Sequence, residues 1–222
     1  MNNHNIKSVT SFSKVLLLLC GIALLTGCST TYYSVWEKMG KHKRDLLRDH
    51  VESAREEQAD AQEQFKSALQ RLKELQNFDG GELEDTYEAL KDDYDESVEH
   101  ADDVKDRIET VDDIAHDLFG EWEEEIELIS NARFKSDSKK KLRTTRKKYA
   151  TLNRSMVKAV KSMEKVLTRF QDHVLYLKHN LNAQAIGGLD AEVVSIGKDV
   201  KKLISDMETS IAQADSFIAT LE

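Results

Sequence analysis

The stretch LEDTYEALKDDYDESVEHADDVKDRIETVDDIAHDLFGEW (residues 83–122) decides the fold, because its apolar side chains recur in alternating steps of four and three. The series contains Leu83, Tyr87, Leu90, Tyr94, Ser97, Ala101, Val104, Ile108, Val111, Ala115, Leu118 and Trp122. Ser97 is its only member with an aliphatic hydroxyl group. An apolar repeat that averages 3.5 residues places one narrow stripe along a helix that packs against other helices. The stretch therefore predicts a long amphipathic helix.

Three more series of the same kind follow this rule elsewhere in the chain. They run from Leu47 to Leu75, from Leu142 to Leu181 with a one-residue slip after Phe170, and from Leu189 to Leu221. The 222 residues include no proline, the residue that breaks helix interiors. One third of the residues are charged, which is also seen in disordered chains, but the sustained heptads favour packed helices over disorder.

The breaks between the series set the expected helix ends. Glycine pairs at 80–81 and 187–188 are suited to helix C-termini. Asn131 is a candidate C-cap, and Ser136, Asp137 or Ser138 are candidate N-caps. We expect helices at about 32–77, 83–130, 138–184 and 189–221. Short connections make neighbouring helices antiparallel, so the predicted fold is all-α, an elongated antiparallel bundle of four long helices with coiled-coil-like heptad packing.

Charge is divided unequally between the second and third predicted helices. Residues 82–130 contain 21 acidic residues and 3 basic ones, whereas residues 133–181 contain 15 basic residues and 3 acidic ones. An antiparallel hairpin would bring EWEEEIE (121–127) against the basic cluster KKKLRTTRKK (139–148). The chain is acidic overall, with a net charge of −9, and this argues against nucleic acid as a partner. A salt-bridge lattice within the hairpin and contact with lipid or cell wall both remain open for the basic cluster.

The N-terminus reads as an export and anchoring signal. VLLLLCGIALL (15–25) has eleven apolar or small residues, whereas a membrane-spanning helix needs roughly 20. This run has the length of a secretory h-region, and Leu25-Thr26-Gly27-Cys28 after it resembles the lipobox of bacterial lipoproteins. We therefore expect a signal peptide at 1–27, acylation (palmitate-type chains) at Cys28 and a periplasmic helical domain at 28–222. Ser29 follows the cysteine in place of aspartate, and by resemblance to enterobacterial sorting this favours the outer membrane, facing the periplasm.

No catalytic constellation is apparent in the sequence. Di-metal bundles need a Glu-x-x-His pair on each of two helices, and the single near match is Asp113-x-x-His116. His173 and Asn180 share a helix face beside the apolar series, which favours a buried polar layer that sets register over a ligand site. The sequence thus predicts a non-enzymatic protein without a cofactor or bound metal, and the alternative is a ligand- or metal-handling bundle.

A partner groove is predicted near the membrane end from helix lengths. The fourth predicted helix has 33 residues and the others about 46, so one lane of the bundle lacks about 13 residues, or roughly 20 Å. This level either closes as three helices or leaves an apolar groove for a protein partner. The candidate groove residues are Phe119, Trp122, Ile126, Ile129, Leu142 and Tyr149. Gly120, beside them, could permit close approach of another helix.

The mature chain also resembles a family of uncharacterised proteobacterial lipoproteins, catalogued as a domain of unknown function. The resemblance rests on YYSVWEKMGKHKRDLL (32–47), EEQADAQEQFKSAL (56–69), NFDGG (77–81), LFGEWEEEIE (118–127) and VLYLKHNLNAQAI (174–186). It implies no known activity, ligand or catalytic residue. The sequence therefore predicts a lipid-anchored periplasmic scaffold or adaptor of the bacterial outer membrane, whose partner is a protein or another cell-envelope component. It does not define an oligomeric state.

Overall fold

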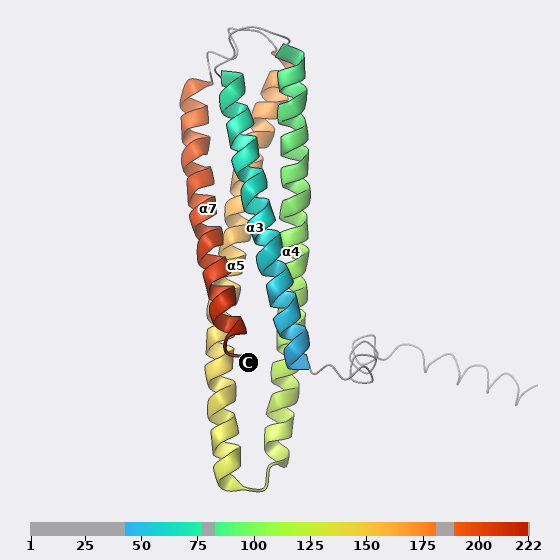
Figure 1. The fold of residues 1–222 in the computed structure, drawn as a ribbon, viewed down its shortest axis with the longest axis vertical. Coiled ribbons are helices and arrows are strands. Elements are labelled where there is room, and N and C mark those ends of the chain that lie inside the picture. Colours follow the sequence, from blue (N-terminus) through green and yellow to red (C-terminus); the bar gives the residue numbers. More distant parts are fainter. Residues whose placement is uncertain (1–42, 77–82, 181–188, 222) are drawn as a thin grey trace, which may run out of the picture. The chain divides into compact units, whose positions relative to one another are not determined.

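A computed structural model describes residues 43–76, 83–180 and 189–221, and this part of the chain consists of four α-helices without a strand. The helices are α3 (Lys43–Gln76), α4 (Leu83–Leu128), α5 (Ala132–His179) and α7 (Asp190–Ile218). They run side by side in alternating directions (Figure 1), and α4 alone, with 46 residues, is about 70 Å long. Each helix packs against two others, in the order α3, α4, α5, α7 and back to α3. The predicted all-α bundle is confirmed.

The core of the bundle follows the apolar series of the sequence. Every series position from Leu47 to Leu75 and from Leu189 to Leu221 is buried, including the polar Gln58 and Ser210. In α4 the buried part of the series runs from Leu90 to Ala115, with Tyr94 half-buried, and the residues at both ends are half-buried as well. The repeat of 3.5 residues therefore identified most of the buried side chains of α3 and α7, whereas near the end of α4 Phe119 and Ile126 are buried outside the series.

The turn between α4 and α5 begins and ends earlier in the sequence than expected. Asn131 is not the C-cap of α4 but the N-cap of α5: its side-chain oxygen accepts hydrogen bonds from the backbone N–H groups of Arg133 (3.0 Å) and Phe134 (3.1 Å). Asparagine is suited to both ends of a helix. Its side chain accepts hydrogen bonds from free backbone N–H groups at the N-terminus, and its backbone can adopt the left-handed conformation that is common at the C-terminus. Six residues predicted as loop, 132–137, are consequently helical, and the turn is confined to 129–131.

Other expected boundaries are placed differently or lie outside the described residues. The helix α5 ends at His179, and α7 ends at Ile218 with a turn over 219–221. Both glycine pairs and the predicted helical residues 32–42 fall outside the described part of the chain. At Gly120 an added Cβ would meet no atom within 4 Å, so this glycine does not serve close approach of another helix.

His173 and Asn180 do not form the shared polar layer that their spacing predicted. The side chain of His173 is buried, and its Nδ1 lies 2.9 Å from the backbone oxygen of Arg169, one turn earlier in the same helix. Asn180 is the C-cap of α5, and its side-chain amide donates a hydrogen bond to the oxygen of Tyr176. The prediction was wrong because α5 ends between the two residues, so Asn180 serves the helix terminus.

Candidate functional site

The charge blocks of α4 and α5 meet near the hairpin turn. The carboxylate of Glu127 lies 2.9 Å from Nζ of Lys135 and 2.8 Å from Nζ of Lys139. Hydrogen bonds from Lys139 and Lys135 lower the pKa of Glu127 to about 2, so this carboxylate is ionised at neutral pH. One turn further from the hairpin end, Arg146 pairs with Glu123 at 2.8 Å. The expected contact between acidic and basic segments therefore exists, and it centres on Glu127.

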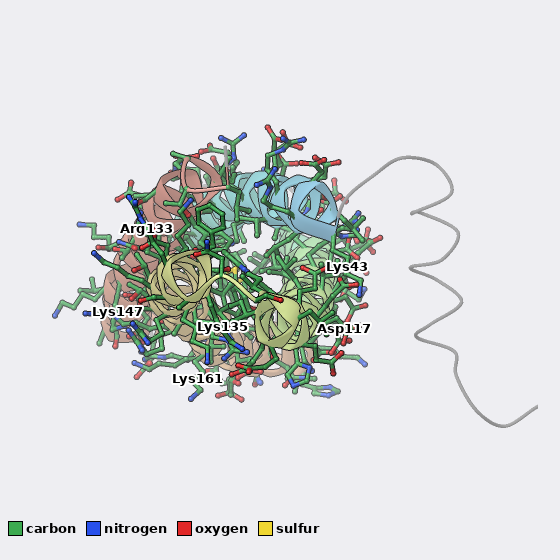
Figure 2. The ribbon with its side chains drawn as sticks, turned by 90° about the horizontal axis from the view of Figure 1, so that it is seen from below. Lys43, Asp117, Arg133, Lys135, Lys147 and Lys161 are labelled. Atoms are coloured by element: carbon green, nitrogen blue, oxygen red, sulfur yellow. The ribbon has the colours of Figure 1, made fainter. Side chains whose placement is uncertain are left out.

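Part of the basic cluster 139–148 is not used by these pairs. Within the described ranges, the side chains of Lys140, Lys141, Arg143, Lys147 and Lys148 make no ion pair with another residue. Figure 2 views the bundle from this end, with Lys147 and Lys161 pointing outward on the side of α5. Lys43 and Asp117 lie on the side of α3 and α4. The hairpin lattice thus leaves several cations of α5 directed at solvent.

Charge exchange tests whether Glu127 is bound to its two lysines in solution. Reversing Lys135 and Lys139 together to glutamate should lower the melting temperature, and so should Glu127→Lys, because each leaves like charges in contact. The combined variant should melt above the temperature expected from adding the two separate shifts. Circular dichroism melts measure this. The matched control combines Glu127→Lys with Lys140→Glu, because Lys140 forms no ion pair with Glu127 in the described part of the chain. The melting-temperature shifts of these two substitutions should be additive.

The six predicted groove residues all lie on α4 and α5 or in the turn between them. Phe119, Ile126, Leu142 and Tyr149 are buried, whereas Trp122 and Ile129 are half-buried. The rings of Phe119 and Tyr149 have centroids 5.6 Å apart, and Phe217 of α7 covers Tyr149 at 5.7 Å. Phe119 and Tyr149 therefore belong to the four-helix core. The groove stays a prediction, and Trp122 and Ile129 are its most exposed members.

A polar cluster that the sequence did not reveal borders this aromatic contact. The hydroxyl of Tyr149 donates a hydrogen bond of 2.7 Å to the carboxylate of Asp112, which also accepts one from the amide of Asn153. Burial and the hydrogen bond to Asp112 raise the pKa of Tyr149 well above its usual range, so the phenol remains a donor. Arg146 lies over the ring of Phe119, 5.7 Å from its centroid, and donates to the oxygen of Phe119. These contacts position side chains of α4 and α5 against each other.

A second cluster surrounds Asp206 on α7, which is only 6% exposed. Its carboxylate pairs with Lys158 at 2.9 Å and Lys202 at 2.5 Å, and accepts a hydrogen bond of 2.6 Å from Ser162. Burial alone would raise the pKa of Asp206, but these hydrogen bonds outweigh it and lower the pKa to about 2. Asp206 therefore joins α5 to α7 as an ionised group.

Acid should weaken the bundle through Asp206. Because its pKa is lowered on folding from 3.8 to about 2, its contribution is complete above pH 4 and is lost as the pH falls through about 2. We expect a loss of about 2 kcal/mol of unfolding free energy from this group. Urea unfolding between pH 5 and pH 2 should show this loss in the wild type and a shallower one in Asp206→Asn. Asp137→Asn, at an exposed position, should behave like the wild type; identical slopes for all three proteins would contradict the assignment.

A cavity of about 430 Å³ lies near the other end of the bundle, between α5 and α7. Arg169 lines this cavity, but its guanidinium group already forms ion pairs with Asp199 at 2.6 Å and Glu192 at 2.9 Å. It also donates a hydrogen bond to the hydroxyl of Ser195. Among the described residues, Asp172, His173, Tyr176 and Leu189 also line the cavity. The cavity is large enough for a small ligand, although its best donor is engaged within the protein.

Metal ligation and membrane crossing have no support in the described residues. No three histidine, cysteine, aspartate or glutamate side chains of this part come close enough to hold a metal ion. His116, the nearest sequence candidate, has a side chain that is 88% exposed. None of the described helices is long and apolar enough to cross a membrane. Cys28, the predicted lipidation site, lies outside the described residues.

Comparison with known proteins adds a family and no activity. Residues 32–221 match the family described as "Protein of unknown function (DUF2959)". No curated protein and no solved structure matches the chain.

Proposed function

The chain belongs to DUF2959, a family of proteins of unknown function, and we propose that this member is a lipid-anchored helical adaptor of the bacterial outer membrane. It faces the periplasm, holds no catalytic centre, and binds a protein or another component of the cell envelope. One observation carries the anchoring: Leu25-Thr26-Gly27-Cys28 directly follows an apolar run of signal-peptide length. Lipid chains on Cys28 would hold the domain at a membrane without any spanning helix.

The adaptor role is supported by the shape and surface of the described domain. Its helices α4 and α5, with 46 and 48 residues, extend for about 70 Å, so the two ends of the bundle can contact structures that are far apart. The charged groups that are buried, such as Asp206, pair within the bundle. Large apolar side chains are exposed at several heights along the bundle, among them Val157, Leu175 and Val194.

A ligand-handling bundle is the second candidate, and the cavity beside Arg169 favours it. Its volume lies within the range of roughly 300–1,000 Å³ that is usual for small-molecule sites. The engagement of Arg169 by three partners argues for a structural role of that side chain, because an incoming anion would have to displace Asp199 or Glu192. The adaptor is therefore the better supported of the two.

Photocrosslinking in intact cells tests the adaptor proposal. A photoreactive amino acid is placed in the full chain at Trp122, Val157, Leu175 or Val194, one position at a time. We expect discrete protein adducts from at least one position, and adducts from Trp122 would support the predicted groove. Met163, whose side chain is fully buried, is the matched control and should give none. If the four surface positions yield no adduct with a protein or with cell-wall material, the adaptor proposal fails.

A further inference from the structure

The turn between α4 and α5 exposes large apolar side chains. Residues 128–134 form the hairpin tip. Leu128 and Phe134 are 83% and 63% exposed, more than any other large apolar side chain of the described residues. They stand on either side of the three-residue turn, one at the end of α4 and the other in the first turn of α5. Two large, exposed apolar side chains therefore lie at the same end of the bundle.

The hairpin tip projects beyond the other two helices, as Figure 1 shows at the lower end of the bundle. The first described residue of α3, Lys43, pairs with Glu121 at 2.9 Å. Phe217, near the end of α7, packs on Tyr149. From Glu121 to Leu128, the last residue of α4, the helix extends the hairpin by about 10 Å at 1.5 Å per residue. Among the described residues, the tip therefore lies beyond Lys43 of α3 and Phe217 of α7.

Cations surround these apolar side chains. Residues 127–143 contain six basic residues and two acidic ones. One of the two acids, Glu127, is already paired with Lys135 and Lys139. Arg133, Lys140 and Lys141 make no ion pair within the described part of the chain. Glu124 and Glu125 on α4 are exposed as well, so residues 124–143 contain six basic and four acidic residues. Exposed apolar groups beside free lysines and arginines are typical of surfaces that bind anionic bilayers.

We propose that the hairpin tip docks on an anionic phospholipid bilayer. Leu128 and Phe134 enter the boundary between headgroups and acyl chains, and Arg133, Lys140 and Lys141 lie beside the phosphates. The inference rests on the proposed lipid anchor at Cys28. The 14 residues between Cys28 and Lys43 join the proposed anchor to α3, and Lys43 pairs with Glu121 near the hairpin tip. The chain therefore enters the described bundle at the end that carries the tip.

Depth measurement on the mature, lipidated protein tests the proposal. Phe134→Cys is labelled with an environment-sensitive fluorophore after reconstitution into vesicles of phosphatidylethanolamine and phosphatidylglycerol. Cys28 is acylated and Cys20 is removed with the signal peptide, so the new thiol alone reacts. We expect a blue-shifted emission that is quenched by nitroxide lipids. Leu175→Cys is the matched control, since it is a 53% exposed leucine on the same helix far from the tip, and its label should remain in water.

Charge removal gives a second readout. Exchanging Lys140 and Lys141 together for glutamine should lower the ratio of docked to undocked protein about 25-fold, since each lysine near an anionic surface contributes about five-fold. The same loss of charge at Lys161 and Lys198, which are exposed on α5 and α7, should change the ratio little. An unshifted label at 134 in protein that floats with the vesicles would overturn tip docking and leave the anchor intact. Equal docking on purely zwitterionic vesicles would also overturn it, and protein that does not float would refute the anchor and the docking together.

Discussion

Cys28→Ser should abolish fatty-acid labelling of the protein and release it from membranes, or leave it as an uncleaved precursor. The cysteine sulfur is the atom that would carry the first lipid, and serine offers no thiol for this bond. Burial of acyl chains contributes about 0.8 kcal/mol per methylene group. Removal of all chains at once therefore shifts the membrane partition by many orders of magnitude. Metabolic labelling with a fatty-acid analogue, followed by fractionation, measures the change.

The chain supplies a matched control for this experiment. Cys20 is the only other cysteine and lies within the apolar run 15–25. Cys20→Ser should be labelled and localised like the wild type, because this residue would leave with the proposed signal peptide. If Cys28→Ser incorporates as much label as the wild type, lipidation does not occur at this position and the anchoring proposal is wrong.

Phe65→Ala should strongly lower the free energy of unfolding of the bundle. The side chain of Phe65 is fully buried in α3, and removal of a buried phenylalanine ring typically costs about 3–5 kcal/mol through lost burial and the cavity that remains. For a domain of this size, each kcal/mol lowers the melting temperature by about 2–4 °C. We expect a decrease of roughly 10 °C in thermal unfolding followed by circular dichroism.

The same substitution at an exposed phenylalanine separates burial from composition. Phe134→Ala removes an identical ring from the hairpin tip, where 63% of the side chain is exposed, and should change the unfolding free energy by less than about 0.5 kcal/mol. Similar effects of the two substitutions would mean that the helices do not pack as described.

Sequence periodicity identified most of the core, because burial in a helical bundle depends on which face a residue occupies; Phe119 and Ile126 near the end of α4 are buried outside the series. The series from Leu47 to Leu75 shows this most clearly, since even Gln58 at one of its positions is buried. Its amide donates to the oxygen of Ala54 one turn earlier, while its Oε1 has no partner within the described residues. The repeat thus places a residue in the core regardless of its polarity, and a local backbone bond reduces the cost.

Contacts that depend on three dimensions were not visible in the same pattern. The start of α5 was missed because residues 132–137 contain little apolar periodicity; a cap from Asn131 and the ion pair of Lys135 with Glu127 accompany the helix there. Asp206 precedes the series residue Met207, and its burial depends on lysines from two helices. The same distinction applies to the proposed sites. The lipidation site at Cys28 is predicted from adjacent residues in the sequence, whereas a surface that binds a partner depends on the shape of another molecule.

The ring order of the helices has a kinetic consequence. Among the described helices, three of the four extensive packing contacts join elements that follow one another in the chain, whereas the contact of α3 with α7 joins distant segments. Such low contact order is typical of domains that fold within microseconds to milliseconds. The 222 residues contain no proline, so no slow isomerisation phase should delay the process. We expect the α4–α5 hairpin to form early and the seam between α3 and α7, joined by Arg55 with Asp215 and by Gln62 with the oxygen of Ile204, to close last.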